Sequence, residues 1–311
     1  MIRKDKFHIT LLLCAAMLCL AANGSVIAED GAQANQVLTG TASPAEDVQG
    51  TSSVPSSQDL DDNSDMDRTG ESDDTVPLYI DGVLDSDCLV IDGTALMSLG
   101  RFATLTGLSF DGSAIGGVTP RLSAGVDYAV VNGRYFYLPD GLYEQGGELL
   151  WPLTVLAKMF GCTAVWDAVT GSIDLDTTRL GLLASGDEFY NEQDVYWLSR
   201  IIFAESGNQP LAGQIAVGNV VLNRAADPRF PDSVFGVIFD QTYGVQFSPV
   251  ETGGIYAEPD EEAVVAAKLA LDGYNTGGNS LYFVNPDIGV SSWFNQTRTY
   301  VTSIGDHDFY A

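Results

Sequence analysis

The sequence predicts an α+β protein in which a small α+β domain precedes a mainly helical domain. Residues 77–178 alternate short β-rich runs with Asp-Gly and Asn-Gly pairs, which are hairpin signals. Residues 188–311 instead carry apolar residues at helical spacing, separated by Gly- and Asn-containing breaks. Both domains follow a polar segment, residues 29–76, and an apolar N-terminal segment, residues 1–28.

The first 28 residues have the pattern of a secretory signal. Three basic residues precede an apolar run, residues 9–22, that is too short to span a bilayer comfortably, and residues 26–28 fit a cleavage site. An uncleaved anchor is the alternative. We expect an exported protein without stable membrane insertion after cleavage, secreted or located in the cell wall, with spore association left open.

Residues 29–76 are predicted to form an extended, acidic linker. The segment is rich in Ser, Thr, Asp and Gly and contains DLDDNSDMD, so it cannot bury enough apolar surface to fold. That run lacks the glycine and the closing glutamate of an EF-hand loop. The whole chain has a net charge of −28, which argues against nucleic acid as a partner.

Residues 77–178 contain two helical runs that repeat each other. ALMSLGRFATLTGLSFD aligns with LLWPLTVLAKMFGCTAVWD, and each copy is expected to be a helix followed by a strand. Cys88 and Cys162 are the cysteines left after the signal; an exported protein allows a disulfide between them, but free buried thiols fit equally. Neither His nor a cluster of acids with metal-ligand spacing occurs here, so we expect no metal.

Two helices joined by a short elbow are predicted near residues 192–206 and 210–225. Asn191 is a suitable N-cap for the first, and its apolar stripe runs through Leu198, Ile201 and Ile202. The next position on that stripe is Glu205. A carboxyl group there should be partly desolvated, which raises its pKa as a glycosidase general acid requires; a solvated helix end is the alternative. Further helices are expected near 232–239 and 260–272, with one β-like run at 281–284.

Several motifs in order resemble the SleB-type cell-wall hydrolases, the spore-cortex-lytic family. They are AESGNQPLAGQIAVGNVVLNR, FPDSVFGVIF, QFSPV, SLYFVNP, SSWF and IGDHDF, spread from about Asp194 to the C-terminus. The resemblance implies a lysozyme-like, lytic-transglycosylase-like helical fold. It also implies that Glu205 is the catalytic residue and that peptidoglycan glycan strands are the substrate.

The resemblance also suggests which other residues serve the site. Those expected near the substrate are Ser206, Gln214, Gln246, Phe247, Ser248, Tyr282, Asn285 and Trp293, and those expected to be structural are Asn223, Arg224 and His307. For each aromatic residue among them, packing in the core is the alternative to contact with a sugar. No cofactor or metal is expected in this half.

A single acid favours the lytic transglycosylase route, since no second carboxylate has an equivalent half-buried position in the sequence. The expected bond is the β-1,4 link between N-acetylmuramic acid and N-acetylglucosamine. A muramidase that uses water and a non-catalytic glycan-binding wall protein are the alternatives.

PLTVLAKMFGCTAVWD resembles the stalk-type domain named after the copper amine oxidase N-terminus. Residues 77–178 are therefore expected to be a spacer or a weak wall-binding module. A protease inhibitor or interaction protein acting through this domain is the alternative, and protein partners are not predicted. We do not infer specificity for spore cortex from the resemblance, because the familiar cortex-lytic enzymes have a small peptidoglycan-binding domain in place of the stalk-type domain.

Overall fold

The structure is a computed structural model that describes residues 74–123, 125–242, 244–288 and 296–311, which belong to one folded unit. The predicted signal, Trp293 and the predicted linker up to residue 73 lie outside the described residues. Strand β1 (Asp74–Ile80) begins at Asp74, so the last three residues assigned to the linker lie in a strand.

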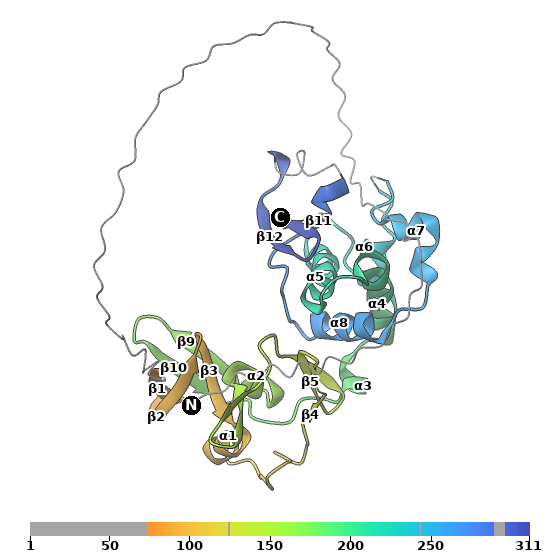
Figure 1. The fold of residues 1–311 in the computed structure, drawn as a ribbon. Helices are drawn as coiled ribbons and strands as arrows, with labels where there is room; N and C mark the ends of the chain where they lie inside the picture. Colours follow the sequence, from red (N-terminus) through yellow and green to blue (C-terminus); the bar gives the residue numbers. More distant parts are fainter. Residues whose placement is uncertain (1–73, 124, 243, 289–295) are drawn as a thin grey trace, which may run out of the picture. The chain divides into compact units, whose positions relative to one another are not determined.

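The first half contains a seven-stranded sheet in the order β7-β8-β3-β2-β1-β10-β9 (Figure 1). Only β1 and β10 pair in parallel. The residues of Asp81-Gly82 and Asp92-Gly93 all have positive φ, which confirms the predicted hairpin turns. Besides β1, the strands are β2 (Val83–Ile91), β3 (Thr94–Ser98), β7 (Tyr143–Gln145), β8 (Glu148–Pro152), β9 (Thr163–Asp167) and β10 (Ser172–Asp176).

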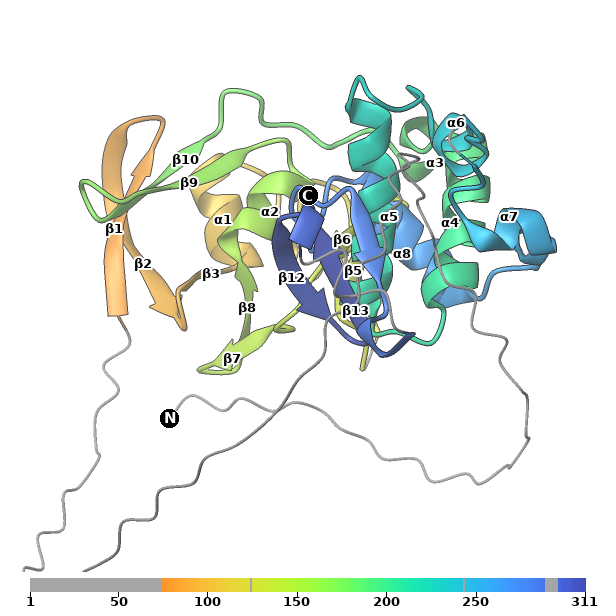
Figure 2. The same cartoon turned by 90° about the horizontal axis from the view of Figure 1, so that it is seen from above.

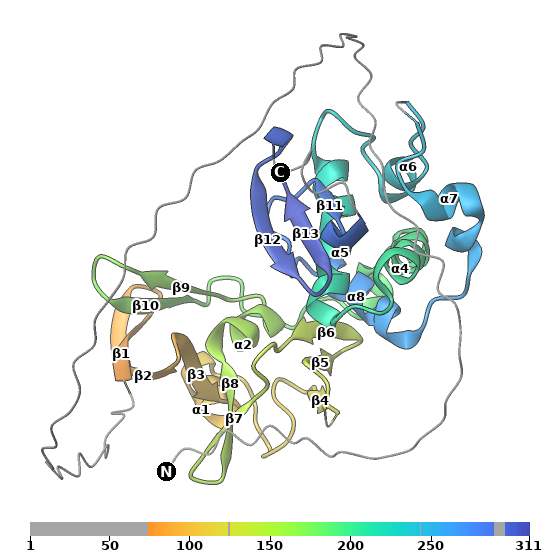
Figure 3. The same cartoon turned by 45° about the horizontal axis from the view of Figure 1, so that its top comes forward.

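The two predicted repeat units differ in the structure. Helix α2 (Leu153–Met159) is followed by β9, as expected, and the two are in contact (Figure 3). Helix α1 (Leu99–Thr106) is followed only by an isolated bridge at Phe110, so the helix–strand prediction is wrong for the first copy. The Asp111 side chain accepts hydrogen bonds from the backbone N–H groups of Ser113 and Ala114, and this local turn bends the chain where a strand would continue.

A separate three-stranded sheet follows α1, in the order β4-β5-β6. It consists of β4 (Arg121–Leu122), β5 (Tyr128–Val131) and β6 (Arg134–Tyr137), and the predicted Asn132-Gly133 turn joins the last two. Helix α3 (Gly186–Phe189) lies at the boundary between the two predicted domains, where the sequence did not predict a helix. Ser185 and Glu188 form a capping box at its start, which stabilises this short helix.

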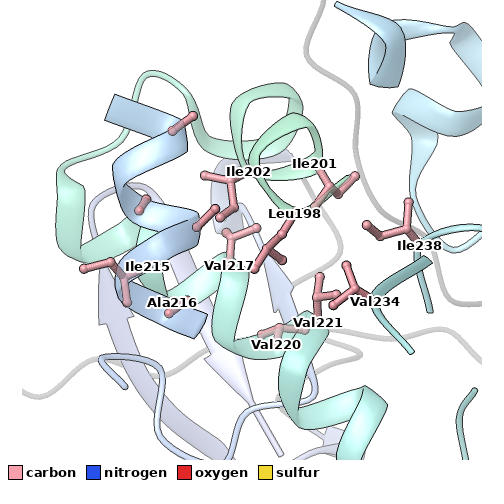
Figure 4. Packing of buried hydrophobic residues seen from close by; sticks show 14 of the residues in the cluster. Leu198, Ile201, Ile202, Ile215, Ala216, Val217, Val220, Val221, Val234 and Ile238 are labelled. Carbon is pink, nitrogen blue, oxygen red and sulfur yellow. The ribbon is translucent and has the colours of Figure 1, made fainter. Parts of the chain in front are cut away.

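The second half is built on three helices that contact one another, α4 (Glu192–Ser206), α5 (Leu211–Ala226) and α8 (Glu261–Leu271). Asn191 caps α4, as predicted, by accepting from two backbone N–H groups. Figure 4 shows Leu198, Ile201 and Ile202 of α4 packed with the valines of α5, and α6 (Val234–Ile238) closes this core. The sequence did not predict α7 (Ser248–Thr252) or the 3-10 turn η1 (Gly254–Tyr256).

The C-terminal residues add a small sheet in the order β11-β13-β12, where one β-like run was expected. The strands are β11 (Tyr282–Val284), β12 (Tyr300–Ile304) and β13 (His307–Tyr310), with a 3-10 turn η2 (Pro286–Ile288) after the first. Strands β11 and β12 contact α5, beside which they lie in Figure 2. The turn between β12 and β13, at Gly305, lies close to Pro210 at the start of α5.

Cys88 and Cys162 are free thiols, both buried, so the structure contains no disulfide between them. Within the described ranges, no helix has the length and apolar character needed to cross a membrane.

Candidate active site

Glu205 lies in the last turn of α4, where the apolar stripe of that helix ends. Its side chain is half-buried, and Oε1 is buried without a hydrogen-bond partner among the described residues. Burial raises the pKa of this carboxyl group to about 8. The carbonyl end of α4 also disfavours a negative charge at this position. The carboxyl group can therefore hold a proton at neutral pH.

The chain turns sharply directly after Glu205. The N–H of Gly207 donates to the Phe203 carbonyl, and the N–H of Gln209 donates to the Ser206 carbonyl. Pro210 occupies the N-cap position of α5, one residue before the first-turn position expected from the sequence. This four-residue elbow, Gly207–Pro210, fixes the direction of α5 relative to the end of α4.

Ser206 and Gln214 lie close to the elbow, but both side chains are fully buried. Ser206 Oγ donates to the Ile202 carbonyl at 2.8 Å, and Gln214 Nε2 donates to the Gln209 carbonyl at 3.1 Å. Their hydrogen bonds support the ends of α4 and α5. Neither side chain presents a surface on which a sugar could lie in this structure.

Gln209 was not among the residues singled out from the sequence, because its partners lie 97 residues away. Its Oε1 accepts from the N–H of Asp306 at 2.8 Å, and its Nε2 donates to Asp306 Oδ2 at 3.1 Å. The neighbouring His307 is buried, its ring lies edge-on to Phe283, and burial lowers its pKa. The β12–β13 turn is therefore attached to the elbow that follows Glu205.

Arg224 of α5 lies in the core. Its Nε donates to the Leu281 carbonyl at 2.7 Å, and its guanidinium is within about 5.3 Å of the ring centres of Phe230, Phe247 and Tyr282. Burial lowers its pKa to about 10. The adjacent Asn223 donates to the carbonyls of Gly278 and Ser280. Both side chains thus hold the segment that leads into β11.

The remaining predicted site residues that the structure describes lie in two segments, one at the start of α7 and one at β11. Phe247 is fully buried in the core, and Gln246 is buried with Nε2 donating to the Gly244 carbonyl. Ser248 begins α7, and Asn285 Oδ1 accepts from the N–H of Asp287. Tyr282 is half-buried beside Arg224. Trp293 lies outside the described residues.

A second carboxylate could come from four other acids of this half, and these lie on the surface or in surface ion pairs: Asp227, Asp240, Glu251 and Glu258. Hydrogen bonds from the Arg229 side chain hold the pKa of Asp227 at about 2. Glu258 pairs with Arg200 at 2.6 Å, Asp240 accepts from Thr242, and Glu251 is exposed. Among these carboxyl groups, only that of Glu205 has an oxygen that is buried without a hydrogen-bond partner among the described residues.

No group of three or more His, Cys, Asp or Glu side chains in the described part of the chain is placed to bind a metal ion. The chemical group that distinguishes this site is the desolvated carboxyl group of Glu205.

Residues 208–310 match the family described as Cell Wall Hydrolase, and this match begins three residues after Glu205. The chain is also similar to curated spore cortex-lytic enzymes. It is 38% identical over 120 residues to the enzyme of Bacillus cereus and 36% identical over 120 residues to that of Bacillus subtilis. Each match covers 39% of this chain, and 45% and 38% of those two enzymes, respectively.

A solved structure with 38% identity is the catalytic domain of the germination-specific lytic transglycosylase SleB from Bacillus anthracis; the match covers 39% of this chain and 97% of that one, with a TM-score of 0.36. The family match over residues 208–310 shows that the C-terminal part of the chain contains a cell wall hydrolase domain. In sequence this domain is similar to the SleB-type catalytic domain. The matches concern this part of the chain, and the resemblance of residues 77–178 to a stalk-type domain stays a prediction.

Proposed function

We propose that the protein is an exported, lysozyme-like lytic transglycosylase that cuts the β-1,4 bond between N-acetylmuramic acid and N-acetylglucosamine in peptidoglycan. The observation that carries this proposal is the half-buried carboxyl group of Glu205 at the end of α4, whose pKa burial raises to about 8. A glycosidic oxygen is a poor leaving group until it is protonated, and a carboxyl group that keeps its proton at neutral pH can supply that proton.

In the proposed reaction, Glu205 donates its proton to the glycosidic oxygen as the bond to the anomeric carbon breaks. The C6 hydroxyl of the muramic acid then bonds to that carbon and returns its proton to Glu205. The product ends in a 1,6-anhydro ring, no water is consumed, and the carboxyl group is regenerated. The surface position of the other acids considered favours this route over one that needs a second carboxylate.

The substrate class follows from the relatives, which are named spore cortex-lytic enzymes. We therefore propose cortex peptidoglycan as the first substrate to test and vegetative wall as the second, and place the protein at the cell wall or the spore. Since the net charge of −28 opposes binding to anionic wall polymers, short-range sugar contacts must supply the affinity.

The test is mass spectrometry of soluble products from purified cortex and vegetative peptidoglycan, digested by the wild-type protein and by Glu205→Gln. Anhydro-muramyl ends that disappear in Glu205→Gln are the expected result. Reducing ends would instead indicate a hydrolase that activates water. If neither wall type releases products, the enzyme proposal fails and a glycan-binding role takes its place.

A further inference from the structure

We propose that Gln209 is a positioning residue for Glu205: its side-chain amide holds the elbow after α4 against the β12–β13 turn through Asp306. This inference rests on the proposed catalytic role of Glu205. It is carried by hydrogen bonds that connect the end of α4, the start of α5 and the C-terminal hairpin through one residue.

Gln209 forms hydrogen bonds through its backbone and through both polar atoms of its side-chain amide. Its N–H donates to the Ser206 carbonyl, and its own carbonyl accepts from Gln214 Nε2. Its Oε1 accepts from the Asp306 N–H, and its Nε2 donates to Asp306 Oδ2 and to Asn208 Oδ1. The residue is only 7% exposed, so these bonds are shielded from water.

The β12–β13 turn leaves room for the Gln209 amide because it has a glycine at the point of contact. Gly305 has a φ of +59°, and a Cβ at that position would lie 2.2 Å from Gln209 Oε1. A Cβ added at Gly213, in the first turn of α5, would lie 3.3 Å from the Gln209 Cβ and 3.5 Å from Ile304 Cγ2. Glycines on both sides thus allow the close approach of the two segments.

Glu205 lies next to Ser206, whose carbonyl is the first acceptor in this set of bonds. If the elbow separated from the hairpin, the last turn of α4 would lose its support and water would reach the carboxyl group. Burial raises the pKa of Glu205, and the titratable groups of the hairpin are Asp306, His307 and Asp308. Loss of the contact should therefore lower this pKa toward that of a solvated glutamate.

The experiment compares the pH dependence of kcat/KM on purified peptidoglycan for the full chain and its variants. In Gln209→Ala, the alkaline limb of the kcat/KM profile should move to lower pH by about one unit or more. The value of kcat/KM at pH 7 should fall about 10- to 100-fold. Gln209→Glu should behave similarly, because it places a second carboxylate against Asp306. Gln193→Glu, on the exposed start of α4, adds the same charge and should leave the profile unchanged.

The double variant Gln209→Glu/Asp306→Asn provides the rescue. It exchanges donor and acceptor between the two side chains, restores the net charge of the wild type, and should recover most of the wild-type profile. A purely structural role predicts a lower Tm with an unchanged alkaline limb. That result for Gln209→Ala, or a double variant no better than Gln209→Glu, would overturn the proposal.

The carboxyl carbon of Glu205 offers a readout that needs no activity. With ¹³C-labelled glutamate, its NMR signal is identified by its absence in Glu205→Gln and is titrated in the wild type and in Gln209→Ala. A lower pKa in Gln209→Ala supports the positioning role even if the wild type cleaves no peptidoglycan, and an unchanged pKa contradicts it. Failure of the proposed function and failure of this inference are thereby distinguished.

Discussion

Arg134 donates two hydrogen bonds to the carboxylate of Asp272, from Nε to Oδ2 at 2.8 Å and from Nη2 to Oδ1 at 2.5 Å, across 138 residues of sequence. The carboxylate is fully buried and also accepts from the Tyr190 hydroxyl at 2.6 Å. The backbone carbonyl of Asp272 accepts from Lys158 Nζ. One residue at the end of α8 therefore connects β6, α2 and the segment before α4.

Arg134→Ala should destabilise the protein by about 3 to 5 kcal/mol, because the buried Asp272 carboxylate loses both hydrogen bonds from the guanidinium and keeps only Lys158 Nζ, 3.9 Å from Oδ1, as a nearby cation. The free energy of unfolding, measured in urea, checks this expectation. Arg121→Ala removes an exposed arginine from β4 of the same three-stranded sheet and should have little effect. Equal stability of the two variants would show that the ion pair adds nothing to the folded state.

Glu205→Gln should make the protein more stable while it abolishes activity. The folded state holds a proton on Glu205 up to about pH 8, whereas the unfolded chain releases it near pH 4.5. The stability contributed by this group is complete below pH 4.5 and is lost as pH rises through 8. A glutamine does not titrate, so Glu205→Gln does not lose stability in this way. Its free energy of unfolding should exceed that of the wild type by little at pH 4 and by on the order of a few kcal/mol at pH 8.

Thermal unfolding of both proteins between pH 4 and pH 9 tests the sign of this effect. Glu251→Gln, which changes an exposed glutamate of α7, is the matched control and should leave the pH dependence of Tm as in the wild type. A difference between wild type and Glu205→Gln that does not grow with pH would mean that Glu205 is solvated in the folded protein.

The parts of this fold that depend on neighbouring residues could be predicted from the sequence. The Asn191 cap sets the start of α4, and the Asn132-Gly133 pair gives a hairpin, because the determining interactions are local. The burial of Glu205 also follows from helical spacing, since Leu198 and Ile201 on the same stripe are fully buried. The local pattern therefore predicted a partly desolvated Glu205, and the resemblance to the SleB-type family singled this residue out as the catalytic one.

The parts that depend on distant partners could not be predicted. Strands β12 and β13 are five and four residues long, and their pairing with each other and with β11 decides that they are strands. The attachment of Gln209 to Asp306 joins residues far apart in the chain, and neither residue type signals it. Phe247 was expected near the substrate, but tertiary packing places it in the core.

Arg224→Ala should reduce the free energy of unfolding by about 3 kcal/mol or more, since it leaves a cavity among three aromatic rings and an unpaired Leu281 carbonyl. Chemical denaturation provides the measurement. The control is Arg229→Ala, which removes an exposed arginine paired with Asp227 and should change stability little. A similar loss in both variants would argue against a core role for Arg224.

Gly305→Ala tests the contact between the elbow and the hairpin without changing Gln209 itself. The added Cβ would lie 2.2 Å from Gln209 Oε1 and 3.1 Å from Pro210 Cδ, so the two segments must separate. The alkaline limb of the pH–rate profile should then move to lower pH, as is expected for Gln209→Ala.

Gly253→Ala is the control for backbone strain. Gly253 has a φ of +83° and no atom within 4 Å of an added Cβ, so the substitution imposes left-handed backbone strain, about 1 to 2 kcal/mol, without a steric clash. It should lower Tm and leave the pH–rate profile in place. If Gly305→Ala behaves in the same way, the hairpin contributes stability only, and the desolvation of Glu205 must arise from the packing of α4 within the helical core.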